Sequence, residues 1–163
     1  MVRPRHWTRA GRALYEARCM DLASIPETIR TIIDQAGGLG LRGAFTYIGA
    51  QDFRYKCAQA EGEYRSAYPS RLTSENGPPR VDFDVGLQFF VNGKPGRKWT
   101  MVIAYEPDDV YSLWLVEGHA GRSAQSMILA CVREVHCDTL QSVIEGTYDR
   151  AIAEHNQGFI PLG

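Results

Sequence analysis

The chain has 163 residues, of which 44% are hydrophobic and 23% are charged, a composition typical of a folded globular domain. A chain of this length buries on the order of 70% of its unfolded surface, so its core needs no disulfide, metal ion or cofactor. With 18 basic and 19 acidic residues the formal net charge is −1. That balance excludes a generally basic nucleic-acid-binding protein and a polyacidic protein, so charge can act only through local patches.

The ends of the chain and its cysteines bear on location. No run of 18 apolar residues and no secretory signal occurs, which favours a cytoplasmic protein without a membrane span. The cysteines are few and scattered, which is typical of free thiols. Residues 1–20 carry five arginines and one glutamate. This basic segment is either an amphipathic helix that binds phosphate or a membrane surface, or a loosely docked extension, and residues 21–163 form the domain proper.

Two amphipathic helices are predicted, one near each end of the domain. Ser24, Pro26 and Glu27 are typical of a helix start, and an isoleucine stripe follows until Gly37 and Gly38. The second helix begins after Asp138, with an apolar face, and ends near residue 158.

Strands are predicted between the helices. The apolar and aromatic residues of 44–48 and 53–57 predict a hairpin, and polar residues 61–80 predict a long surface loop. Alternation from Val81 to Val91 predicts one long strand, followed by strands at 99–105, 110–116 and 127–132. The predicted fold is α+β: an antiparallel sheet, made of a hairpin plus a four-strand meander, with the N-terminal and C-terminal helices packed on one face.

No motif in the chain is diagnostic of a reaction. Residues 38–43 match the string G-x-G-x-x-G, but a helix precedes and a strand follows, the reverse of a dinucleotide site. No cysteine and histidine spacing matches a metal site, so we expect no metal and no cofactor. Cys137, next to the start of the last helix, is the only candidate nucleophile, with His119 or His155 as its base, and a merely incidental thiol is the alternative.

Aromatic and basic residues alternate in two stretches, as in sheets that stack unpaired bases. A half-buried strand with aromatics on one face and cations on the other produces the same pattern. The candidate nucleic-acid-binding residues are Arg42, Phe45, Tyr47, Phe53, Arg54 and Lys56.

The function we expect is a non-catalytic protein-binding or regulatory domain, with basic and acidic patches that dock a partner by complementarity. Its four aromatic residues are hot-spot candidates and equally good core residues. The candidate partner-binding residues are Trp99, Tyr105, Tyr111, Trp114, Lys94, Arg97, Lys98, Glu106, Asp108 and Asp109.

The size and fold class also fit a small inhibitor encoded by a phage or another mobile element and acting on host defence or nucleic-acid machinery, although no particular residue points to this role. The alternatives are a small enzyme or small-ligand binder with a pocket between sheet and helices, and a single-stranded nucleic-acid binder. Oligomeric state stays open.

Overall fold

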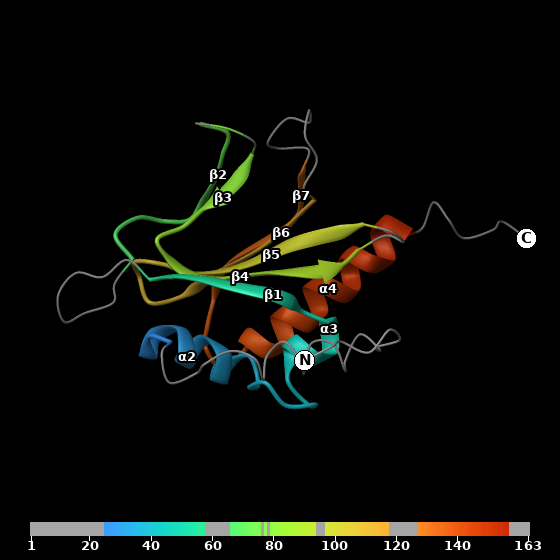
Figure 1. Ribbon diagram of the computed structural model, residues 1–163, viewed down its shortest axis with the longest axis horizontal. Helices are drawn as coiled ribbons and strands as arrows, with labels where there is room; N and C mark the ends of the chain where they lie inside the picture. Colours follow the sequence, from blue (N-terminus) through green and yellow to red (C-terminus); the bar gives the residue numbers. More distant parts are fainter. Residues whose placement is uncertain are drawn as a thin grey trace, which may run out of the picture.

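A computed structural model describes residues 25–57, 66–75, 77, 79–93, 97–117 and 127–156. Within these residues the fold is α+β, with a five-stranded antiparallel sheet, a separate two-stranded sheet and three helices (Figure 1). The elements in chain order are α2 (Glu27–Gln35), α3 (Ala44–Ile48), β1 (Gln51–Cys57), β2 (Arg71–Thr73), β3 (Arg80–Asp82), β4 (Val85–Asn92), β5 (Lys98–Tyr105), β6 (Tyr111–Glu117), β7 (Ile128–Val135) and α4 (Leu140–Asn156). None of these helices is long and apolar enough to span a membrane.

The large sheet has the order β1-β4-β5-β6-β7, and every neighbouring pair is antiparallel. Strands β4 to β7 follow one another in space as in sequence, so the predicted four-strand meander is confirmed. Strand β1 lies beside β4, at the opposite edge from β7. Among the described residues, β1 and β7 are therefore the two edge strands of this sheet.

The main core lies between the sheet and the helices. Alternate residues of β4 and β5, such as Leu87, Phe89 and Trp99, share one apolar cluster with Ile29 of α2 and Ile144 of α4. Helix α2 contacts β1 and β4, α4 contacts β6 and β7, and α3 contacts α4. Figure 1 shows all three helices below the large sheet. We call the side of the sheet that meets this cluster the inner face.

The outer face of the sheet carries a second, smaller core. The hairpin of β2 and β3 folds over it, so that Val81 and Phe83 contact Val102 and Trp114. Figure 1 shows this hairpin on the opposite side of the sheet from the helices.

The predicted strand at Ala44–Ile48 is wrong, because this segment is helix α3. Its side chains suit a strand, but Gly49 adopts a left-handed conformation with φ of 69° and ends a single helical turn. Phe45 and Ile48, three positions apart, are both buried, as one face of a helix requires. The predicted hairpin with residues 53–57 therefore does not form, and β1 pairs with β4 instead.

The single long strand predicted from Val81 to Val91 is also wrong, since β3 and β4 are separated at residues 83–84. Across this break the odd-numbered side chains change face: Phe83 belongs to the outer core and Val85 to the inner core. The Asp84 carboxylate accepts a hydrogen bond of 2.7 Å from the backbone N–H of Ala67. The predicted loop 61–80 likewise contains β2, while its residues 61–65 lie outside the described part of the chain.

Both predicted amphipathic helices are confirmed as elements α2 and α4. Helix α2 ends before Gly37 and Gly38, which both have positive φ. Its N-cap is Pro26, without a side-chain hydrogen bond. The predicted cap Ser24 and the basic segment 1–20 lie outside the described residues.

Candidate functional site

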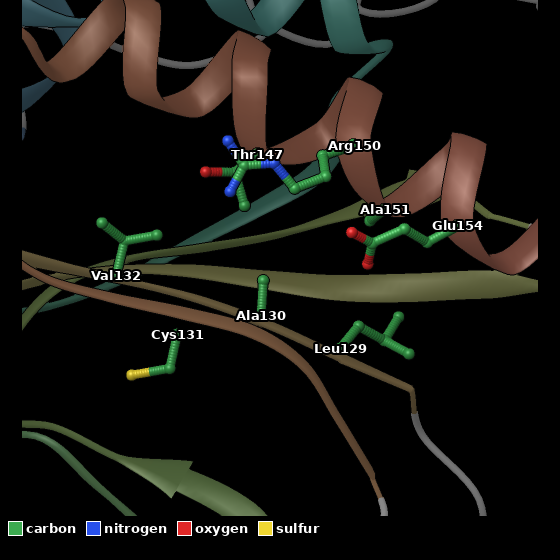
Figure 2. A pocket seen from close by; sticks show the side chains of 8 residues that line it. All are labelled: Leu129, Ala130, Cys131, Val132, Thr147, Arg150, Ala151 and Glu154. Carbon is green, nitrogen blue, oxygen red and sulfur yellow. The ribbon is translucent and has the colours of Figure 1, made fainter.

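A groove runs along the β7 edge of the sheet, beside helix α4. Its volume is about 280 Å³. The lining residues are Leu129, Ala130, Cys131 and Val132 from β7 and Thr147, Arg150, Ala151 and Glu154 from α4 (Figure 2).

The lining shows that the groove follows the backbone of β7. Successive side chains of a strand point to opposite faces, so a cavity on one face touches every second residue. This groove touches four consecutive residues, Leu129 to Val132, which indicates that it reaches the open edge of the strand. Figure 2 shows Ala130 and Val132 on the α4 side of the strand and Cys131 on the other side. Along this stretch β7 pairs with β6, and no other described strand lies beside it.

Helix α4 forms the wall of the groove. Its lining residues occupy positions i, i+3, i+4 and i+7, which form one stripe of a helix. Ala151 is buried and small, whereas Arg150 and Glu154 are exposed. No ion pair joins Arg150 or Glu154 to another described residue. The groove thus offers apolar surface at its base and one charge of each sign along its rim.

Cys131 is exposed and borders the groove, with its side chain on the face of β7 away from α4 (Figure 2). Desolvation raises its pKa, the Arg133 guanidinium lowers it, Glu106 raises it further, and the net direction is upward. A raised pKa reduces the thiolate fraction at neutral pH, which argues against Cys131 as a nucleophile.

Behind β7, on the outer face, lies a buried polar cluster centred on Glu106. Its carboxylate accepts hydrogen bonds from the Ser70 backbone N–H, at 2.8 Å, and from the Ser70 hydroxyl. Arg133 of β7 lies 3.3 Å from the same carboxylate and donates to the Ser70 carbonyl oxygen at 2.9 Å. Trp114 donates to the Ser70 Oγ at 2.9 Å, and the Arg133 guanidinium stacks 5.0 Å from its ring centre.

This cluster connects the segment before β2 to the sheet. Ser70 and Glu106 are 2% and 4% exposed, so neither reaches a substrate. Their hydrogen bonds satisfy groups that burial would otherwise leave without partners. The cluster therefore ties Ser70, just before β2, to Trp114 of β6 and Arg133 of β7.

The aromatic residues predicted as either anchors or core residues are mostly core. Trp99, Tyr111 and Trp114 are buried, and Tyr105 is half-buried with its hydroxyl bonded to Asp109. Tyr111 donates a hydrogen bond of 2.5 Å to Gln35 of α2. In this conformation they are not available as exposed anchors.

Two of the predicted charged residues, Arg97 and Glu106, form ion pairs. Arg97 forms an ion pair of 2.7 Å with Glu117, and Glu106 is buried in the cluster already described. Lys98, Asp108 and Asp109 are exposed. Lys94 lies outside the described residues.

The structure does not bring the candidate nucleophile Cys137 near the candidate base His155. Cys137 precedes α4 and His155 lies in its last turn, where its ring meets Trp99. The 1.5 Å rise per residue places them roughly 25 Å apart. His119 lies outside the described residues. Among the described residues, no group of histidines, cysteines and carboxylates is arranged to hold a metal ion.

The six candidate nucleic-acid-binding residues do not share one surface. Phe45 is buried in α3, and Phe53 packs against it with ring centres 5.3 Å apart. Arg42 precedes α3 in an exposed turn, and Tyr47 of α3 donates a hydrogen bond to Asp149. Only Arg54 and Lys56 share a sheet face, because they alternate on β1.

No protein-family model matches the chain, and no curated protein or solved structure is significantly similar to it. Sequence reasoning predicted a pocket between sheet and helices only as an alternative, and it named none of the residues that line this groove, although it predicted a strand at 127–132 and a helix after Asp138. The spacing of Thr147, Arg150, Ala151 and Glu154 was visible as a helical stripe, but only the fold shows that an open strand edge faces it.

Proposed function

We propose that this chain is a non-catalytic protein-binding domain that accepts an extended segment of a partner protein as an added strand on β7. The groove along the open edge of β7, lined by four consecutive strand residues and one stripe of α4, is the observation that carries this proposal.

An extended peptide suits both walls of the groove. An open strand edge presents N–H and C=O groups that pair with a partner's backbone, and pockets for alternate side chains supply specificity. Side chains of the added strand that face α4 would meet the small residues Ala130 and Ala151. We infer that the partner places small or medium apolar residues there. Arg150 and Glu154 at the rim favour flanking residues of opposite charge in a defined order.

The competing enzyme hypothesis lacks a reaction centre in the described residues. Cys131 is the one thiol among the residues that line the groove, and burial disfavours its thiolate. The Ser70 hydroxyl is committed to Glu106 and buried. The geometry therefore favours binding.

The test begins with a random linear dodecapeptide library displayed on phage and panned against the intact chain. Selected peptides are synthesised, and their affinity is measured for the wild type, for Ala130→Arg and for Ala153→Arg. Ala130→Arg fills the groove, whereas Ala153 is exposed on α4 outside it and serves as the matched control. We expect at least tenfold weaker binding for Ala130→Arg only, with unchanged far-ultraviolet circular dichroism for both variants.

Two further readouts distinguish strand addition from other docking. Each peptide is made in two versions, one N-methylated at its odd-numbered residues and one at its even-numbered residues. Only one version should lose binding, because only alternate N–H groups of a strand face its neighbour. Bound peptide should also slow maleimide labelling of Cys131 and leave exposed Cys137 unaffected. The proposal is refuted if both methylated versions of a peptide bind equally well and Ala130→Arg leaves the affinity unchanged.

A further inference from the structure

The outer face of the sheet has a part that the β2–β3 hairpin does not cover. It carries Arg54 and Lys56 of β1, Gln88 and Phe90 of β4, and Lys98 and Thr100 of β5. We call these six residues the outer patch. They share a face because their neighbours Leu87, Phe89 and Trp99 belong to the inner core.

Strand register makes the outer patch continuous. Arg54 is directly opposite Gln88, and Phe90 is directly opposite Thr100. Lys56, opposite Gly86, and Lys98, opposite Asn92, lie on the same face at the two ends of the patch. Directly opposite residues of neighbouring strands have Cβ atoms about 5 Å apart, so the patch is a surface of adjoining side chains.

Charge on the outer patch is of one sign. Arg54, Lys56 and Lys98 are exposed, and none forms an ion pair with a described carboxylate. Two of these cations lie over aromatic rings instead: the Lys98 ammonium is 5.9 Å from the Phe90 ring centre, and the Lys56 ammonium is 5.2 Å from that of Phe83. Phe90 itself is half-buried.

Two acidic residues at the end of β3 and just after it, Asp82 and Asp84, already have partners. Asp82 lies 3.6 Å from the guanidinium of Arg71. Asp84 accepts the hydrogen bond from Ala67. Among the described residues, the three cations of the outer patch therefore have no ion-pair partner, in a chain whose formal net charge is −1.

We infer that the outer patch binds single-stranded nucleic acid. Three cations on β1 and β5, the strands that flank β4, match a ligand with repeated negative charges, and the Phe90 ring on β4 between them offers a platform for a base. Gln88 and Thr100 supply a side-chain amide and a hydroxyl that can hydrogen-bond to base edges. Lys98 is flexible enough to leave the Phe90 ring for a phosphate when a base stacks there. An acidic protein would use the cations but would gain nothing from the ring.

The test is fluorescence anisotropy with 5′-labelled dodecamers of thymidine and of uridine, titrated with the full chain between 50 and 200 mM salt. Three phosphate contacts give a slope of log K against log salt of about −2, so affinity should fall roughly 18-fold over this range. Lys98→Gln should reduce the magnitude of that slope by about 0.7. Arg150→Gln, on α4 and outside the outer patch, is the matched control and should leave the slope unchanged.

The aromatic contribution is tested separately with Phe90→Leu, which keeps an apolar side chain at this half-buried position. Loss of one stacked base should weaken binding about tenfold at constant salt. Three outcomes would overturn the inference: no binding at 50 mM salt, a salt slope that Lys98→Gln leaves unchanged, or equal affinities for wild type and Phe90→Leu. Competition by polyglutamate that matches competition by unlabelled oligonucleotide would instead assign the outer patch to acidic proteins. None of these results bears on the groove, so the peptide-binding proposal stands or fails independently.

Discussion

Replacing Glu106 by alanine should be among the most destabilising single changes on the outer face of the sheet. Its carboxylate accepts from both the N–H and the hydroxyl of Ser70 and lies 3.3 Å from Arg133. Because Ser70 is 2% exposed, water cannot replace the lost acceptor without opening the segment before β2.

The expected cost follows from the groups left behind. A buried N–H without an acceptor costs about 1–3 kcal/mol, and a further loss of about 1 kcal/mol follows from the vacated side-chain volume. The Arg133 side chain is 46% exposed and rehydrates, so its lost ion pair adds little. The free energy of unfolding should fall by about 3 kcal/mol, and Tm by about 6–12 °C. Glu106→Gln should cost roughly half as much, because the Ser70 hydroxyl can turn and accept from the new amide.

Urea unfolding followed by tryptophan fluorescence measures these differences, since Trp114 belongs to the same cluster. Asp108→Ala, two residues along and exposed, is the control and should change the free energy of unfolding by less than about 0.5 kcal/mol. Two results would contradict this prediction: Glu106→Ala no more destabilising than Asp108→Ala, or Glu106→Gln lowering the free energy of unfolding as much as Glu106→Ala.

Three further predictions concern glycines and a tyrosine. Gly86→Ala should destabilise by about 2 kcal/mol in urea unfolding, because its Cβ would lie 2.4 Å from the Ile103 carbonyl oxygen. Gly146→Ala should stabilise by about 0.5–1 kcal/mol in the same assay, because the new methyl group enters open space on α4. Burial, followed by the charges of Tyr105, Cys137 and Asp109, raises the pKa of Tyr111. Its contribution to stability is therefore complete below the unfolded tyrosine pKa of about 10 and is lost as pH rises beyond it. Tyr111→Phe should flatten the decline in stability measured between pH 9.5 and 11.5, and an unchanged decline would contradict this.

The periodicity of apolar residues correctly predicted the elements in which one face is buried and the other is exposed to solvent. The isoleucine stripe of α2 and the alternation of β4 are both of this kind. Over a segment as short as one helical turn, periodicity does not distinguish a helix from a strand. Helix α3, with its buried Phe45 and Ile48, is such a case. Gly49, directly after this turn, was the sequence signal for the end of a helix, whereas the aromatic and β-branched side chains favoured a strand.

The candidate site was harder to predict than the fold. A strand at 127–132 is legible in the sequence, but whether it lies at an edge depends on where β1 pairs, and β1 joins the sheet at β4, far from β7. The aromatic residues were poor guides because Trp99 and Trp114 fill two cores on opposite faces of one sheet. A charge run was equally misleading, since Arg97 and Arg133 come from distant positions to pair with Glu117 and Glu106.

The two sheet edges differ in a way that favours β7 as the strand acceptor. Natural proteins protect open edges with charges and bulges, and β1 has both: a register irregularity between Gln51 and Arg54, and exposed cations at Arg54 and Lys56. Strand β7 is also irregular, between Ile128 and Ala130 and between Val132 and Val135, but its regularly paired stretch, Ala130–Val132, carries no charge, whereas that of β1 carries Arg54 and Lys56.

An incoming strand at β7 also gains a helical wall, because α4 extends beside that edge. Such a strand would bury side chains as well as pair its backbone, which a bare edge cannot offer. Because the outer patch lies on the other face, around β1, β4 and β5, a peptide on β7 and an oligonucleotide on the patch would not collide. A saturating dodecathymidine should therefore leave the affinity for a β7-bound peptide unchanged within about twofold, and mutual exclusion would show that the two ligands share one surface.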